Sequence, residues 1–313
     1  MQIFKKFTRP GLALTIGSRL LTVTGFTLLS RLAGFARDIL LAALLGSGAL
    51  ADAFFIALRL PNHFRALFAE GAFNAAFVPA YTQLANPKEK FAFAGKILTY
   101  VLIVQFIILF IALLRMEPFV KVLFLKIETN QEYLNTVVTL SRITFPYLML
   151  VTLVTVLSSV LNAHNRFAVA AGAPVLFNIS IILVLSVAWW WPKGTSALFP
   201  TLGHAAAWGV FLAGFLEVCL LILACRMAGV LPAYSGLKWT APLPVFVRRL
   251  GPALTGAGSG QIALFADTIL AAALPVGAVS ALYYADRLYQ LPVGLIAISL
   301  GTVLLPAFSQ MIS

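Results

Sequence analysis

The chain has 313 residues, of which 61% are hydrophobic and only 10% are charged, and its mean hydropathy is +0.98. Soluble domains carry about 25% charged residues, so this composition excludes a soluble globular protein and predicts a polytopic membrane protein. The net charge of +12 does not indicate nucleic-acid binding, because much of the excess lies in short loops between apolar runs, where it is a topology signal.

About eight apolar stretches are long enough for transmembrane helices, since a helix needs about 20 apolar residues to cross a bilayer. These runs do not alternate apolar and polar residues as barrel strands do, so the predicted fold class is all-α. Lys and Arg gather in the N-terminal segment and in every second loop, which places the N-terminus in the cytoplasm. The expected spans lie near residues 21–45, 50–83, 93–114, 134–161, 168–191, 203–226, 246–274 and 279–310.

The stretch 28–83 carries seven charged side chains in two expected spans. A charge at the centre of a span costs about 3 kcal/mol or more to insert, so such charges usually face a polar cavity. The pattern therefore predicts a cavity inside the bilayer with more positive than negative charge on its wall. The charged residues are Arg31, Arg37, Asp38, Asp52, Arg59, Arg65 and Glu70.

The second span also contains residues that weaken a helix, namely Pro61, Gly71 and Pro79. A proline kink without function is the alternative interpretation. Beside Arg59 and Arg65, a broken backbone that lines a wet cavity is favoured.

The later spans offer fewer polar signals. Arg142 and Glu217 are the main candidates for buried charge. A side chain that reaches the membrane face is the alternative for Arg142, and a polar partner within the bundle is the alternative for Glu217. Cys219 and Cys225 lie in one apolar run with no CxxC motif, which favours packing thiols over a disulfide framework or a metal site.

An internal repeat relates the seventh and eighth spans to the first and second. The segment DILLAALLGSGALADAFF from Asp38 matches DTILAAALPVGAVSALYY from Asp267 at a constant offset. Because an even number of helices separates the copies, the repeat is parallel, and a substrate site is expected between the halves. We therefore predict a six-helix lobe over residues 1–228, a cytoplasmic linker over 229–245 and the first two helices of a second, incomplete lobe over 246–313. On this interpretation the chain is a C-terminally truncated transporter.

Several motifs carry a resemblance to a known family. The chain resembles the MurJ (MviN) family of lipid II flippases, which implies a multi-pass protein of the bacterial inner membrane, in a superfamily that includes multidrug and polysaccharide exporters. Members of the family have more helices than the eight expected here. The motifs are SRLAGFARD at 30–38, DAFF at 52–55, LPN at 60–62, FAEGAF at 68–73, YYADRL at 283–288 and GTVLLP at 301–306.

The resemblance also implies roles for particular residues. Arg31, Arg37, Arg65 and Arg287 would line the central cavity and bind the cargo. Many family members have a second arginine directly after the position of Arg65, where this chain has Ala66. The carboxylates that match further family positions in or beside the cavity are Asp38, Asp52, Glu70 and Asp286.

The implied cargo, lipid II, is a disaccharide-pentapeptide joined by pyrophosphate to a polyprenyl chain. Arginine binds phosphate oxygens through a planar fork, so the residue types suit this cargo. The expected function is lipid translocation by alternating access and not catalysis, with lipid II and membrane lipids as partners and no cofactor. An exporter of drugs or of another polyprenyl-linked oligosaccharide is the alternative, and a membrane scaffold is a second one.

Transport by this route needs an energy source, and sodium, protons or the membrane potential are the candidates. Asp267 lies inside the seventh span without an adjacent basic residue, which makes it a candidate cation ligand. A hydrogen-bonded packing residue is the alternative for Asp267.

Overall fold

The computed structural model describes residues 16–69, 72–124, 130–190, 199–234, 236 and 242–290, and this part of the chain contains helices and no strand. The all-α prediction is therefore confirmed for the described residues. Residues 278–290 are helical as well. The labelled helices are α2 (Ile16–Leu45), α3 (Ala49–Ala69), α4 (Ala72–Thr82), α5 (Pro87–Leu114), α6 (Met116–Leu123), α7 (Gln131–Thr144), α8 (Tyr147–Ala163), α9 (Phe167–Trp190), α10 (Leu202–Ala228) and α11 (Pro242–Ala272).

The helices follow the order of the expected spans, and the protein is a multi-pass membrane protein. Four helical stretches of the described part are long and apolar enough to cross a membrane by length and composition alone. These stretches are α5, the pair α7–α8, α9 and α10. The predicted lobe and linker boundaries stay predictions.

Three local features differ from the predicted elements. The fourth span is divided at Pro146 into α7 and α8, because proline lacks the backbone donor that a continuous helix needs. The short helix α6 forms where a loop was expected. Pro61 and Pro79 lie inside α3 and α4, so neither proline ends its helix. Residues 70–71, between these helices, lie outside the described residues.

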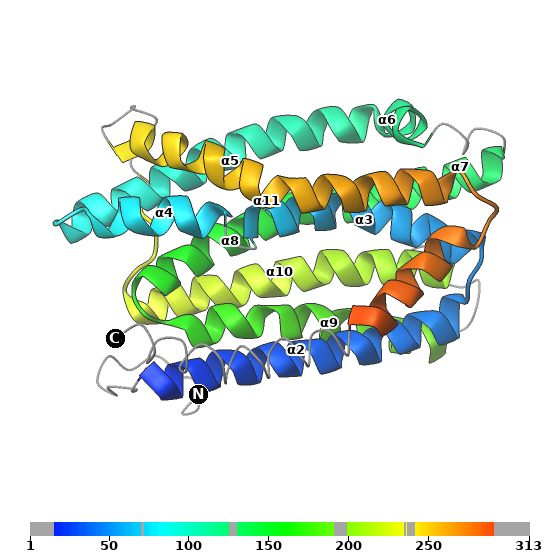
Figure 1. The fold of residues 1–313 in the computed structure, drawn as a ribbon, viewed down its shortest axis with the longest axis horizontal. Helices are drawn as coiled ribbons and strands as arrows, with labels where there is room; N and C mark the ends of the chain where they lie inside the picture. Colours follow the sequence, from blue (N-terminus) through cyan, green and yellow to red (C-terminus); the bar gives the residue numbers. More distant parts are fainter. Residues whose placement is uncertain are drawn as a thin grey trace, which may run out of the picture.

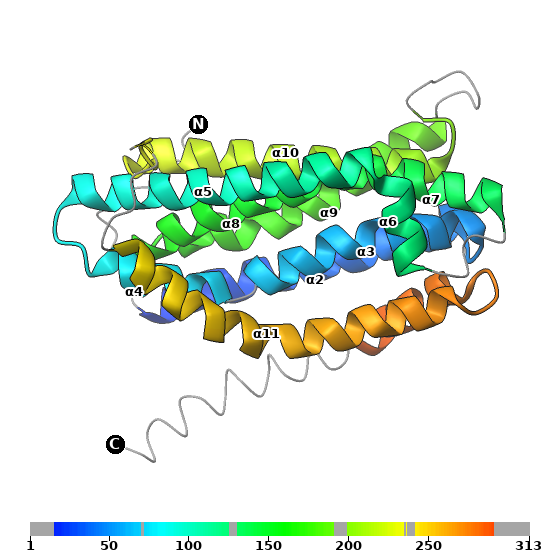
Figure 2. The ribbon, with the colours of Figure 1, turned by 90° about the horizontal axis from the view of Figure 1, so that it is seen from above.

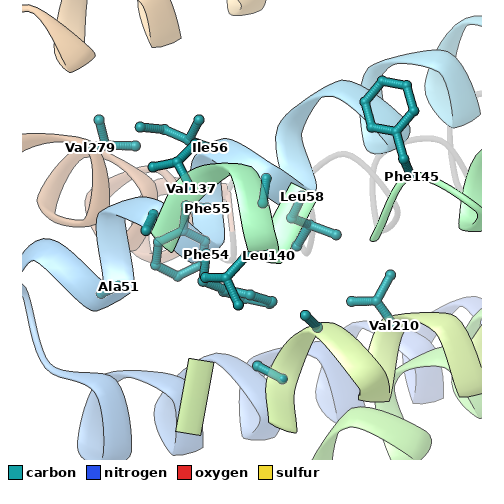
Figure 3. Close-up of a cluster of buried hydrophobic side chains, with 14 of the residues drawn as sticks. Ala51, Phe54, Phe55, Ile56, Leu58, Val137, Leu140, Phe145, Val210 and Val279 are labelled. Atoms are coloured by element: carbon teal, nitrogen blue, oxygen red, sulfur yellow. The ribbon is translucent and has the colours of Figure 1, made fainter. Parts of the chain in front are cut away.

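Apart from the short α6, the helices run roughly along the long axis of the molecule (Figures 1 and 2), and Figure 2 shows α11 at one edge of the bundle. Helix α9 packs between α2 and α10, while α3 contacts α7, α8, α10 and α11. The first half of α3 is enclosed by these neighbours, and every residue from 51 to 58 is buried. Figure 3 shows Phe54 and Phe55 of α3 facing Leu140 of α7 and Val210 of α10, with Val279 close by.

The helical segment 278–290 is attached to α3 by polar and aromatic contacts. Asp52 accepts hydrogen bonds from the backbone N–H groups of Gly277 (2.6 Å) and Ser280 (2.7 Å). It thereby caps the N-terminus of a segment distant in sequence. The Tyr283 ring stacks on Phe55 with 3.9 Å between centroids. Segment 278–290 is therefore held against α3, beside the charged turns that follow the buried half of that helix.

Candidate functional site

A cavity of about 680 Å³ lies inside the bundle, between α2, α3, α4, α8, α9, α10 and segment 278–290. One face of α8 lines it from end to end, through Tyr147, Val151, Thr155, Ser158 and Asn162. At 1.5 Å per residue these positions span about 22 Å of helix. The cavity is therefore elongated along the bundle, and its volume lies within the range of about 300–1,000 Å³ that is usual for ligand sites.

All four arginines that the sequence predicts as cargo ligands line this cavity, and their role as ligands stays a prediction. They come from separate elements: Arg31 and Arg37 from α2, Arg65 from α3 and Arg287 from segment 278–290. The lining also contains two carboxylates, Asp38 and Glu217. With both carboxylates ionised, the wall would carry two more positive than negative charges.

The other predicted residues are placed elsewhere. Asp52 caps segment 278–290, and Asp286 is half-buried outside the cavity lining. Asp267 is exposed on α11. Glu70 lies outside the described residues. Arg142 is exposed on α7, which agrees with the membrane-face alternative and not with a buried charge, whereas Glu217 is buried as predicted, with 4% of its surface exposed.

At one end of the cavity, Arg37 is buried and its donors are directed at protein acceptors. Its Nε and Nη2 donate to Asp38 Oδ1 at 2.9 and 2.6 Å. Its Nη1 donates to Asn178 Oδ1 at 2.8 Å, and Nη2 also reaches Tyr283 Oη at 3.1 Å. The guanidinium therefore joins α2, α9 and segment 278–290, and we call this group of residues, with Arg287, the Arg37 cluster.

Asn178 of α9 links the Arg37 cluster to the backbone of α2 and of its own helix. Its Nδ2 donates to the carbonyl oxygens of Ser30 and Pro174, both at 3.0 Å, which leaves Oδ1 for Arg37. Asn178 was not among the residues predicted from the sequence. A lone amide in the apolar run of α9 was the available signal, because a polar group at that depth needs partners.

Asp38 lies between two guanidinium groups. Besides Arg37, its Oδ2 lies 3.4 Å from Nε of Arg287. Arg287 also donates from Nη1 to Gln290 Oε1 at 3.1 Å, and its guanidinium lies 4.9 Å from the centre of the Tyr283 ring. One carboxylate thus offsets part of the buried charge of Arg37 and of the half-buried charge of Arg287, and this limits the cost of holding both in the bundle.

The remaining arginines lie toward the other end. Arg31 precedes Arg37 by six residues, or about 9 Å along α2. Its side chain is exposed, and no hydrogen bond or ion pair is formed by it within the described part of the chain. Arg65 donates from Nε to Asn62 Oδ1 at 2.9 Å. The cavity therefore has one end closed by internal bonds and another end where Arg31 is accessible.

Fold and site together define a multi-pass helical membrane protein with a cationic internal cavity of ligand size. The family model described as "Lipid II flippase MurJ" matches residues 41–313. The chain belongs to the lipid II flippase MurJ family.

The chain is similar to curated members of that family. It is 39% identical to the probable lipid II flippase MurJ of Rhizobium meliloti over 92% of this chain and 54% of the relative. It is 36% identical to the protein of the same description from Haemophilus influenzae, over 91% of this chain and 56% of the relative. The chain thus spans about half the length of the curated relatives it matches.

A solved structure described as "Lipid II flippase MurJ, inward closed conformation" has a similar fold. The TM-score is 0.76 at 25% sequence identity, over 93% of this chain and 59% of that chain.

Proposed function

We propose that this chain forms the cargo-binding part of a lipid II flippase in a bacterial inner membrane. Arg31, Arg37, Arg65 and Arg287 surround the pyrophosphate as the lipid passes from the cytoplasmic to the periplasmic leaflet by alternating access. The observation that carries this proposal is the placement of all four arginines on the wall of one cavity inside the bundle.

The chemistry of the cargo suits this wall. A pyrophosphate is strongly anionic, and arginine binds phosphate oxygens bidentately while staying protonated in a poor dielectric. Asp38 offsets Arg37 and Arg287 while the cavity is empty. Arrival of the anion supplies a second acceptor for these guanidinium groups, so Asp38 and the cargo compete for the same donors.

The orientation of the cavity supports loading from the cytoplasm. The clustering of Lys and Arg in the N-terminal segment predicts a cytoplasmic N-terminus. The accessible Arg31 lies nearer the N-terminus of α2 than the internally bonded Arg37. In this orientation the accessible end faces the cytoplasm and the Arg37 cluster closes the periplasmic side.

The alternative is an exporter of drugs or of another polyprenyl-linked oligosaccharide. A cationic drug would favour a wall dominated by carboxylates and aromatic rings, whereas this wall carries four arginines and two carboxylates. Another polyprenyl pyrophosphate cargo would use the same arginines. Binding measurements therefore have to compare lipids that differ in their head groups. A membrane scaffold gives no reason for this convergence of charge.

The decisive measurement is lipid binding by the purified chain in nanodiscs, with lipid II, undecaprenyl pyrophosphate and undecaprenol as ligands. Both pyrophosphate lipids should bind more tightly than the uncharged alcohol. Arg31→Ala should weaken their binding about tenfold, since hydrogen bonds to charged groups contribute about 1.5–3 kcal/mol. Arg31→Lys should restore part of the affinity, because lysine keeps the charge but loses the fork.

Arg142→Ala is the matched control, because Arg142 is exposed on α7 and does not line the cavity. It should leave binding unchanged. Equal affinity for undecaprenol and the pyrophosphate lipids, or wild-type binding by Arg31→Ala, would remove the basis of the proposal.

We also propose that a cation gradient or the membrane potential drives transport, with Asp267 as a cation ligand. The support is the position of a carboxylate within an apolar run of α11. In the described residues no group of three His, Cys, Asp or Glu side chains is placed to share a metal ion.

A further inference from the structure

Glu217 of α10 is a buried carboxylate on the wall of the cavity. Only 4% of the residue is exposed, yet its side chain lines the cavity. Its Oε2 is buried and forms no hydrogen bond within the described part of the chain. A buried acceptor without a partner costs about 1–3 kcal/mol, and more when it is charged, so this oxygen calls for a ligand.

The packing of α10 against α8 fixes the position of Glu217 along the length of the cavity. One turn earlier, Gly214 lies so close to Tyr147 that an added Cβ would be 2.6 Å from the ring. Further along, the Cys225 thiol approaches the Leu157 carbonyl at 3.9 Å. Helices α8 and α10 therefore run side by side in the same direction. Glu217 lies about one turn beyond the level of Tyr147, on the way toward Asn162.

Two ionisable groups, Arg65 and Tyr147, lie near enough to Glu217 to interact with it electrostatically. No ion pair or hydrogen bond joins either group to its carboxylate within the described residues, and Arg65 Nε donates to Asn62 Oδ1. A carboxyl group is thus placed on the wall of a cavity whose positive groups come from α2, α3 and segment 278–290.

We propose that Glu217 binds a primary ammonium group on the head group of the cargo. This assignment rests on the proposed function and adds a second determinant to the same cavity: arginines for the pyrophosphate and one carboxylate for an amine. The pentapeptide of a lipid-linked precursor is the part of the cargo that carries such an amine. An ammonium group donates up to three hydrogen bonds, and Glu217 supplies a charged acceptor for one of them.

An inorganic cation is a poorer occupant of this position. Hard divalent cations take six or more oxygen ligands, several of them carboxylates. The cavity lining offers Glu217 as an isolated carboxylate, and no group of three potential metal ligands is formed within the described part of the chain. A single carboxylate on a wall that also carries hydroxyl and amide groups, such as Thr155 and Asn162, suits an ammonium group better.

The test compares two forms of lipid II that differ at one position, a free side-chain amine on the peptide or the same amine N-acetylated. The wild-type chain in nanodiscs should bind the amine form about tenfold more tightly, as expected for one charge-assisted hydrogen bond. Glu217→Gln should bring this ratio close to one by weakening the binding of the amine form. Glu217→Asp keeps the charge and should retain an intermediate ratio.

Glu132→Gln is the matched control, since Glu132 is exposed at the start of α7 and lies outside the cavity lining. It should keep the wild-type ratio, and all variants should share one unfolding temperature.

Three results would overturn the assignment. One is a wild-type chain that binds undecaprenyl pyrophosphate but shows no preference for the amine. Another is a Glu217→Gln variant that keeps the preference. The third is a Glu217→Gln variant that loses only a sodium dependence of binding, which would make an inorganic cation the occupant. A wild-type chain that binds neither lipid II nor undecaprenyl pyrophosphate overturns the proposed function as well, so the two failures are distinguishable.

Discussion

The two ends of the cavity differ in how their charged groups are partnered. At the closed end, Arg37 and Asp38 direct their polar atoms at each other, at Asn178 and at Tyr283. At the accessible end, the Arg31 side chain has no hydrogen-bond partner among the described residues. Glu217 Oε2, farther along the cavity wall, has none in the described residues either. Charged groups that are satisfied within the protein hold helices together, whereas unsatisfied groups that face a cavity are available to a ligand.

The two ends also differ in the origin of their residues. The Arg37 cluster joins α2 and α9 to segment 278–290, so it spans distant parts of the chain. Arg31, at the accessible end, projects from one helix and makes no such connection in the described structure. Substitutions at the closed end should therefore change stability, and substitutions at the accessible end should change ligand binding.

The largest expected effect comes from Asp38→Ala at the closed end. The substitution leaves Arg37 buried without its carboxylate and removes the ion pair to Arg287. Breaking a buried pair on one side costs about 3–5 kcal/mol, so the unfolding temperature in detergent should fall markedly. Glu132→Ala, at an exposed carboxylate, should leave that temperature unchanged. An unchanged unfolding temperature for Asp38→Ala would show that the cluster does not hold the bundle together.

A smaller effect is expected from Asp52→Ala, which removes the cap of segment 278–290. Loss of a cap costs about 1–2 kcal/mol, and here the cost falls on the attachment of one segment. Hydrogen exchange at the backbone amides of Gly277 and Ser280 should become faster. Ser280→Ala removes the hydroxyl but keeps both amide bonds to Asp52, so it is the control. Equal exchange rates in Asp52→Ala and the wild type would contradict the capping role.

The smallest effect on stability is expected from Asp267→Asn, since Asp267 is exposed on α11. The free energy of unfolding should change by less than about 0.5 kcal/mol. If Asp267 is a cation ligand, the dependence of lipid II binding on sodium concentration or on pH should become weaker. The affinity at saturating cation should stay at the wild-type value. If lipid II binding by Asp267→Asn depended on sodium concentration and on pH as in the wild type, Asp267 would be a surface residue and not a cation ligand. The proposed function would then rest on the cavity alone.

Helical order and the cationic cavity wall could be predicted without a structure. Long apolar runs form helices because the bilayer core leaves no other way to satisfy the backbone. Charges within those runs face a cavity because lipid does not solvate them. The four arginines meet this expectation, since they share one cavity lining. Asp52 does not meet this expectation, because it caps segment 278–290 and lies outside the cavity lining.

The features that the sequence analysis missed depend on local backbone geometry or on contacts between helices. Pro146 divides the fourth span, although Pro61 and Pro79 stay inside helices. The same residue type thus has different effects in different surroundings. Glu217 was predicted to be buried, but its place on the cavity wall follows from the close approach of Gly214 to Tyr147.

The sequence alone determined the class of protein, the order of its helices, the family and the sign of the charge within its spans. These properties follow from composition and from short motifs, which act without reference to distant residues. Only the tertiary structure decided which charges are paired. Arg37 and Asp38 are adjacent in sequence, a spacing that does not direct two helical side chains at each other. Their shared partner Tyr283 lies 246 residues beyond Arg37. Helical periodicity assigns each side chain to a face, but the packing of apolar faces decides which helix that face meets.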